Sequence, residues 1–72
     1  MLSPIERQVL TCVASRGGKV KLQEIKAAIN APEPYINAAI HALAKDHEFV
    51  KRYLNHVMIT IEGRAFHDIY PW

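Results

Sequence analysis

A proline-containing break near the middle of the chain limits the helices that it can form. Residues 30–34 read Asn-Ala-Pro-Glu-Pro, and a proline inside a helix removes a backbone hydrogen bond and clashes with the preceding turn. The apolar residues on either side of this break therefore cannot belong to one long helix. We expect two short helices joined by a tight turn, the second of which begins near residue 33 or 34.

The N-terminal segment carries several agreeing signals for another helix. Ser3-Pro4-Ile5-Glu6 supplies a capping serine, a proline at the first helical position and a glutamate three residues after the cap. Apolar residues then recur at helical spacing until Gly17-Gly18, where glycine suits the left-handed end of a helix. The first helix is therefore predicted over about residues 4–16.

A second helix is predicted between these glycines and the proline break. Leu22, Ile25 and Ile29 are spaced as on one face of a helix, with residues 23, 24, 26 and 27 pointing outward. The segment before it, Lys19-Val20-Lys21, is too short to be predicted as more than a piece of extended chain.

The residues after the break predict a helix, a hairpin and a last helix. The helix covers about residues 33–46, and its inward stripe consists of Ile36, Ala39, Ile40 and Leu43. Residues 49–60 are rich in β-branched and aromatic side chains around Asn55-His56, which is typical of two strands joined by a tight turn. Residues 61–70 follow a capping Thr60. The expected fold class is mainly α with a small antiparallel β-hairpin, an α+β arrangement.

Length and composition restrict the class of protein. A chain of 72 residues is near the lower limit for one core without disulfides, so a single domain over residues 1–72 is expected. Half of the residues are apolar and 22% are charged, which is the balance of a folded protein. Cys12 is the single cysteine, which favours a cytoplasmic location. No apolar stretch approaches the roughly 20 residues that cross a bilayer, so no membrane partner is expected.

The order of these elements resembles a winged helix-turn-helix domain, and the resemblance covers essentially the whole chain. Ile36, Ile40 and Leu43 match the apolar pattern of the recognition helix in that family, and Ile25 and Ile29 stand at the apolar positions of the helix before it. The resemblance implies a three-helix core, a wing and a short C-terminal helix in one winged-helix domain. It also implies a DNA-binding protein that regulates transcription, as in bacterial members of the family.

Two motifs around the hairpin carry the resemblance further. Phe49-Val50-x-Arg52 is similar to the L-I-x-R pattern at the start of the family's wing, and Ile59-Thr60-x-x-Gly63-Arg64 is similar to the L-T-x-x-G-r signature that follows it. The chain departs from the family at Asp46-His47-Glu48, where many members have a glycine, and its wing is very short.

The second motif contains a sequence with another interpretation. Ile61-Glu62-Gly63-Arg64 matches the cleavage motif of a blood-clotting protease that expression vectors often include, so these residues could be an engineering scar. A scar is not expected to fall in register with a family motif on both sides. Thr60 precedes it as a helix cap, and Phe66 and Ile69 continue an apolar face after it. We therefore interpret the segment as part of the natural fold.

The candidate DNA-binding residues of the third helix lie opposite its apolar stripe. A helical wheel places Ala38, His41 and Lys45 on that side, with Tyr35 and Asn37 on the flanks. Asparagine can bond to adenine, histidine and lysine can reach guanine or a phosphate, and alanine can touch a thymine methyl group. The alternative is an ordinary solvated helix face, since the helix lacks arginine.

The hairpin supplies a second group of candidate residues, Lys51, Arg52, Asn55 and His56. These side chains would hold phosphates or reach into a minor groove. Lys19, Lys21 and Lys26 add charge near the second helix. The alternative is that lysines on a hairpin edge only prevent aggregation between strands.

Other chemical functions lack a motif. The four histidines at 41, 47, 56 and 67 and Cys12 do not have the spacing of a known ligand set, so no metal is expected. No phosphate loop, nucleophile elbow or paired-carboxylate motif is present, so neither an enzyme nor a cofactor nor a small-molecule ligand is expected.

The expected function is therefore binding of double-stranded DNA, with the helix at about 33–46 in the major groove and the wing at about 49–60 on the flanking backbone. The alternative is a winged-helix module for protein–protein contact, because a fold does not fix a function. Several apolar residues exceed what one small core obviously needs, so they either form a homodimer interface or cover the back of the first helix. They are Leu10, Phe66, Ile69, Tyr70 and Trp72.

Overall fold

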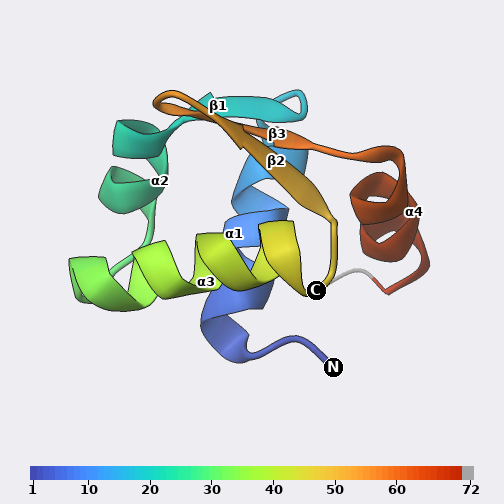
Figure 1. Cartoon of the computed structure of the whole chain (residues 1–72), viewed down its shortest axis with the longest axis horizontal. Helices are drawn as coiled ribbons and strands as arrows, with labels where there is room; N and C mark the ends of the chain where they lie inside the picture. Colours follow the sequence, from blue (N-terminus) through green and yellow to red (C-terminus); the bar gives the residue numbers. More distant parts are fainter. Residues whose placement is uncertain (71–72) are drawn as a thin grey trace.

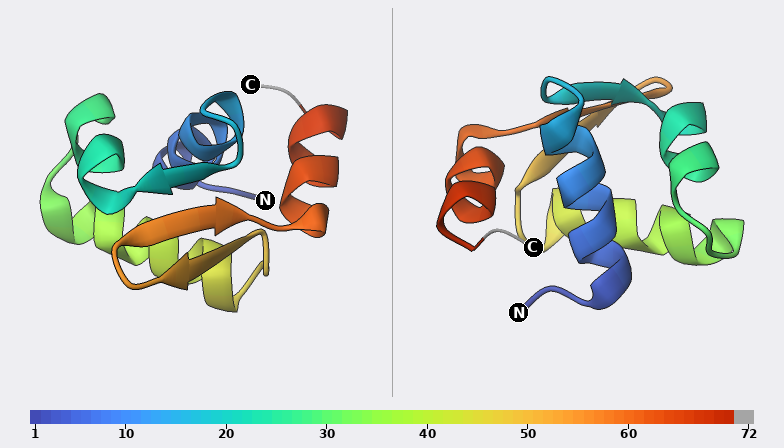
Figure 2. Two further views of the ribbon diagram at one scale, coloured as in Figure 1. Left: turned by 90° about the horizontal axis from the view of Figure 1, so that it is seen from above. Right: turned by 180° about the vertical axis from the view of Figure 1, so that it is seen from behind.

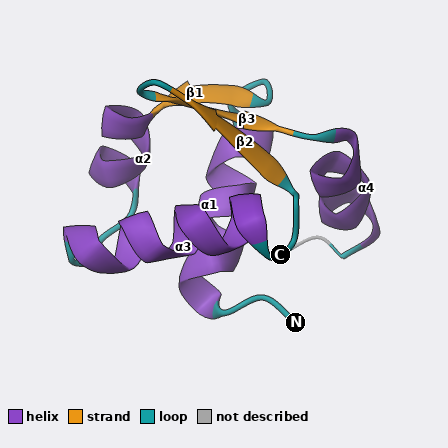
Figure 3. Ribbon diagram, in the orientation of Figure 1, coloured by secondary structure: helices purple, strands orange, loops and turns teal. Residues whose placement is uncertain are grey.

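The chain forms four helices and a small antiparallel sheet in residues 1–70, which are the residues that the computed structural model describes (Figure 1). The elements in chain order are α1 (Pro4–Ser15), β1 (Lys19–Lys21), α2 (Leu22–Ala28), α3 (Glu33–Lys45), β2 (Val50–Tyr53), β3 (His56–Ile59) and α4 (Ile61–Ile69). Figure 3 shows the short strands lying over the helices, at one side of the molecule. The predicted α+β class and the predicted helices are confirmed.

The start and end of α1 follow the predicted signals. The Ser3 hydroxyl accepts a hydrogen bond from the Glu6 N–H (3.2 Å), and the Glu6 carboxylate accepts one from the Ser3 N–H (3.0 Å). This reciprocal pair satisfies two donors that a helix start otherwise leaves open. At the other end, Gly17 and Gly18 have φ angles of 84° and 88°, a region that side chains rarely allow.

The sheet has three strands, whereas a two-stranded hairpin was predicted. The strand order is β1-β3-β2, and both pairings are antiparallel. Strand β1 pairs along its length with β3, so that Val20 lies opposite Val57 and both side chains are buried. The segment 19–21 is stable as a strand because β3 supplies its hydrogen bonds and the helices cover its valine. The segment is extended, as predicted, but the prediction that it is no more than a piece of extended chain was wrong.

The hairpin turn lies one residue earlier than predicted. Leu54 and Asn55 form the turn, and His56 pairs with Tyr53 as the first residue of β3. Leu54 has a φ angle of 54°, so an ordinary side chain takes a conformation that favours glycine. The sequence therefore lacked the glycine that usually indicates this kind of turn.

The core lies between the helices and one face of the sheet (Figure 2). The predicted inward stripe of α3 is confirmed, because its four residues are buried. Ile29 follows the last residue of α2 and is also buried. The fully buried large side chains are Leu10, Ile25, Ile36, Ile40, Leu43, Val9, Val13, Val50 and Val57.

Leu10 does not belong to the exposed surface in which it was predicted. Its side chain is 0% exposed and forms part of the core. Helix α1 contacts α2, α3, α4 and the sheet, so its apolar side is wider than one stripe. Leu10 is therefore excluded from any dimer surface of the folded protein.

Gly63 fixes the position of α4. A Cβ atom at this residue would overlap the backbone carbonyl of Phe49, whose oxygen accepts the Thr60 N–H (2.9 Å). The Thr60 hydroxyl caps α4 by accepting from the Gly63 N–H (3.0 Å), and it donates to the carbonyl of Glu48 (2.7 Å). Ile61-Glu62-Gly63-Arg64 is thus an integral part of the packed structure.

Glu48, just before β2, adopts a backbone conformation that favours glycine. Its φ angle is 57°, in the left-handed region. The hydrogen bond from Thr60 to its carbonyl holds this conformation in place.

Among residues 1–70, no helix is both long and apolar enough to cross a membrane.

Candidate nucleic-acid interface

The outer side of α3 carries four of the predicted site residues in one strip. Tyr35, Ala38, His41 and Lys45 lie along it and recur every three or four residues on the helix. The opposite side of the same helix is anchored in the core, which fixes the direction of the strip. The predicted outward position of these residues is confirmed, whereas their binding to DNA stays a prediction.

Asn37 differs from the other predicted residues of α3. It is half-buried, and its Oδ1 atom is buried without a hydrogen-bond partner in the described residues. Bidentate recognition of adenine requires this oxygen to accept from the adenine amino group. In the orientation described, Asn37 therefore does not present its full hydrogen-bonding edge to a partner.

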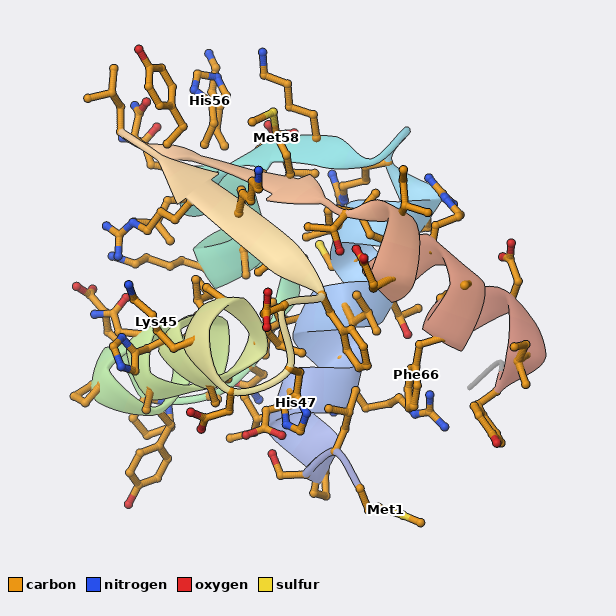
Figure 4. The ribbon with its side chains drawn as sticks, turned by 45° about the vertical axis from the view of Figure 1, so that its right-hand side comes forward. Met1, Lys45, His47, His56, Met58 and Phe66 are labelled. Carbon is orange, nitrogen blue, oxygen red and sulfur yellow. The ribbon has the colours of Figure 1, made fainter. Side chains whose placement is uncertain are left out.

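Three cationic residues from two elements line one depression between α3 and the sheet. Lys45 at the end of α3 and Lys51 and Arg52 of β2 line a depression of about 280 Å³ with Ala44 and Val50. The short connection between α3 and β2 returns the chain alongside the helix, which brings these residues together. Lys45 is labelled in Figure 4. We call Lys45, Lys51 and Arg52 the basic cluster.

Carboxylates lie beside the basic cluster on one side, whereas Glu33 lies at the opposite end of α3. Glu48 and Glu62 share an adjoining depression with Lys51. Glu33, in the first turn of α3, forms an ion pair with Lys26 (Nζ to Oε1, 3.0 Å), so each compensates the charge of the other. Lys26 therefore adds little to the positive charge that was predicted near α2, whereas the described structure gives the basic cluster no ion pair.

The tip of the hairpin is held against the start of α2. The Leu22 N–H donates to the carbonyl of Asn55 (2.7 Å), and β3 is paired on its outer side by β1. The hairpin therefore does not project beyond the sheet as a long wing would. Its exposed polar side chain at the tip is Asn55.

Strand alternation divides the predicted wing residues between two faces of the sheet. Arg52 lies opposite the buried Val57, on the side of the helices, and its Nε donates to the Leu54 carbonyl (3.5 Å). Lys51 and His56 belong to the alternate positions, which point to the outer face. The sequence placed these three residues in one group. In the structure Lys51 and Arg52 point to opposite faces of β2 and share only the depression beside Lys45.

The surface of α4 contains the remaining predicted partner residues. The Phe66 ring stacks on Phe49 (4.7 Å between centroids) and contacts Tyr70 (5.1 Å), and the Arg7 guanidinium lies 5.2 Å from its centroid. Arg7 also donates to the Tyr70 carbonyl (2.6 Å). Phe66 is thus half-buried within the protein, while Ile69 and Tyr70 are 67% and 56% exposed. Trp72 lies outside the described residues.

Comparison with known proteins gives no relationship on which to base a function. No protein-family model, no curated protein and no solved structure matches the chain.

Proposed function

We propose that the chain is a winged-helix domain that binds duplex DNA and regulates transcription or a related DNA transaction in the cytoplasm. The element order and the strand order β1-β3-β2 support the winged-helix assignment, together with the motifs around Thr60 and Gly63. In this proposal α3 enters the major groove and β2 lies along the adjoining phosphates.

The observation that carries the proposal is the basic cluster. It joins the end of the candidate recognition helix to the strand that leaves it, so one duplex backbone can be held while the helix lies in a groove. The outer strip of α3 is continuous with this cluster through Lys45. Phosphate contacts of this kind supply most of the affinity of non-specific DNA binding.

The two groups of residues have different roles in the proposal. Lys51 and Arg52 neutralise phosphates and position the protein, whereas His41 and Ala38 face base edges and supply sequence preference. Asn37 is a weaker candidate for base recognition because its Oδ1 atom is buried. The small side chain of Ala38 leaves room for close approach of the helix to the groove.

Fluorescence anisotropy on labelled duplexes tests the proposal. Lys51→Ala and Arg52→Ala should each weaken binding to all duplexes and lower the salt-dependence slope by about 0.9 for each phosphate that is no longer neutralised. His41→Ala should cost about 1–3 kcal/mol on a duplex selected from a random pool, with little effect on random duplexes.

Arg16→Ala is the matched control. Arg16 is exposed at the end of α1 and pairs with Glu24 (3.7 Å), outside the basic cluster. The variant removes one positive charge without removing a proposed contact. Absence of salt-sensitive duplex binding down to roughly 50 mM salt would contradict DNA binding and favour a protein-contact module, for which the sparse charge of α3 is suited.

The proposal includes a second copy of the chain. Ile69 and Tyr70 expose apolar surface on α4, next to a depression of about 340 Å³ lined by Met1, Leu2, Arg7, Phe66 and Tyr70. A homodimer through this surface would double the phosphate contacts and match a palindromic site.

A further inference from the structure

The outer face of the sheet presents a defined set of side chains, most of which the proposed duplex site does not use. The registers place Lys19 opposite Met58 and Met58 opposite Lys51, in one row across the three strands. They place Lys21, His56 and Tyr53 in a second row. Because opposite residues share a face, all six side chains project away from the helices. We call them the outer sheet face.

The helices leave this face open in the described residues. Figure 2 (left) looks onto the strands, with α3 behind them and α1 beside β1. In Figure 4, His56 and Met58 project from the side of the sheet away from the helices. Val20 and Val57, which lie between these positions in β1 and β3, are buried on the opposite side of the sheet. Side chains of the two strands therefore alternate between the core and the open face.

The charge of the outer sheet face has one sign. Its two rows contain Lys19, Lys21 and Lys51 and no carboxylate. Two carboxylates lie at its margins. Glu24 accepts a hydrogen bond from the Lys21 N–H (3.0 Å), and Glu62 lines a depression beyond the end of β3 with Lys51 and Met58.

The same face exposes rings and apolar side chains among its lysines. Tyr53 is 66% exposed and the adjoining Leu54 is 76% exposed. His56, directly opposite Tyr53, is half-buried and contributes a second ring. Charged residues are the usual means of preventing aggregation at an edge strand. That role therefore does not explain an exposed tyrosine on β2.

We propose that the outer sheet face binds single-stranded nucleic acid. Bases stack on Tyr53 and His56, while the lysines hold phosphates. Lys19 and Lys21 are about 7 Å apart along β1, and Lys19 and Lys51 are about 10 Å apart across the sheet, from the usual strand dimensions. An extended single strand can therefore lie across the rows with its bases on the rings and its phosphates near the lysines.

This chemistry favours a single strand over other polyanions. A duplex hides its base faces in the stack and would leave the rings of Tyr53 and His56 without a partner. An acidic peptide would pair with the lysines but has no repeated flat rings to stack. The outer sheet face and the basic cluster share only Lys51. The two rings, Lys19 and Lys21 belong to the outer sheet face alone, so single-strand binding does not depend on the proposed duplex site.

Anisotropy with labelled oligomers of about ten nucleotides, within the usual footprint of a single-strand site, tests the inference on the full chain. Tyr53→Ser should weaken binding by a factor between about 5 and 150, the range for the removal of one stacked base. Tyr53→Phe should bind as the wild type does. Lys19→Gln and Lys21→Gln should each lower the salt-dependence slope by about 0.7.

A reciprocal pair of variants separates this surface from the proposed duplex site. Tyr35→Ser removes a comparably exposed ring from α3 (59% exposed) and should spare single-strand binding, as should Lys45→Gln. Loss of single-strand binding in these two variants, with Tyr53→Ser unaffected, would overturn the inference even if nucleic acid is bound. Equal competition by a polyglutamate peptide would also overturn it, because stacking would then contribute nothing.

A measurement on the unaltered protein covers the case in which Tyr53→Ser fails to fold. The methyl resonance of Met58, in the centre of the outer sheet face, should shift on titration with an oligomer, while that of Met1 should not. An unchanged Met58 signal at saturation would overturn the inference. Parallel titrations with DNA and RNA oligomers of one sequence determine which sugar the face prefers.

Discussion

Helices α3 and α4 each present a candidate binding surface, but they are attached to the protein by different contacts. Four side chains of α3 are buried, including Ile36 and Leu43. In α4 the buried residue is Gly63, which has no side chain, and the helix is held by the Thr60 cap, the close approach to Phe49 and the rings around Phe66. Apolar burial therefore fixes α3, whereas backbone proximity and local contacts fix α4.

The difference has a consequence for dynamics. Opening α3 exposes the centre of the core, so it is expected to require global unfolding, whereas α4 is expected to detach while the core remains closed. A DNA-reading helix benefits from the first property because base contacts require fixed geometry. A surface for association tolerates the second.

The largest expected effect is in α3. Leu43→Ala removes a side chain that is 0% exposed, and it should lower the free energy of unfolding by about 2–5 kcal/mol. This loss is a large part of the stability of a small domain. Urea denaturation followed by circular dichroism measures it. His41→Ala on the exposed side of the same helix is the control, and an equal loss in both variants would contradict the assigned burial.

The next effect is in α4. Gly63→Ala should lower the free energy of unfolding by about 1–3 kcal/mol, because the added Cβ meets the Phe49 carbonyl. Helix propensity alone predicts the opposite, a gain of up to about 1 kcal/mol, so the sign of the change decides between the two. Ala65→Gly, at an exposed position of α4, should show the propensity effect by itself. A stabilised Gly63→Ala variant would mean that α4 is not held by this approach.

A smaller effect is expected at the cap of α4. Thr60→Val keeps the shape of the side chain but removes the hydrogen bonds to the Gly63 N–H and the Glu48 carbonyl, at a cost of about 0.5–2 kcal/mol.

Detachment of α4 can be observed directly, because Ile61-Glu62-Gly63-Arg64 is the motif of the clotting protease and lies within the helix.

Cleavage after Arg64 should be slow in the wild type and several-fold faster in Thr60→Val, under conditions in which the core stays folded. Ser3→Ala, which removes the cap of α1, is the control for a general loss of stability. Equal acceleration by both variants would show that α4 opens only with the whole domain, and the contrast with α3 would be wrong.

Helix boundaries were predictable where local chemistry determines them. The capping box at Ser3 and the break around Pro32 depend on a few neighbouring residues, and both appear as predicted. Strand β1 was not predictable from Lys19-Val20-Lys21 alone, because its stability comes from β3, which is distant in the chain. Glu48 and Leu54 adopt left-handed conformations without the glycine that would have indicated them.

The candidate site was predictable in its parts and not in its arrangement. A helical wheel identified the outer strip of α3, but it could not detect that Asn37 has a buried Oδ1 atom. The alternation of β2 implied that Lys51 and Arg52 face opposite sides. Only the pairing of β1 with β3 places Lys19 and Lys21 on the same face as Lys51.

The smallest effect on stability is expected at Ile69, an exposed residue of α4 in the proposed dimer surface. Ile69 is 67% exposed, so Ile69→Ser should change the free energy of unfolding by no more than about 0.5 kcal/mol. In a homodimer through α4 the same side chain is buried against the partner, and the variant should sediment as a monomer at a concentration at which the wild type sediments as a dimer. Tens of micromolar is the order at which a weak dimer forms.

Ile61→Ser makes the same chemical change at the start of α4 (86% exposed) and should leave the dimer intact. A wild type that is strictly monomeric at this concentration contradicts the proposed homodimer, and α4 would then serve only to cover Phe49 and the side of α1 that it contacts.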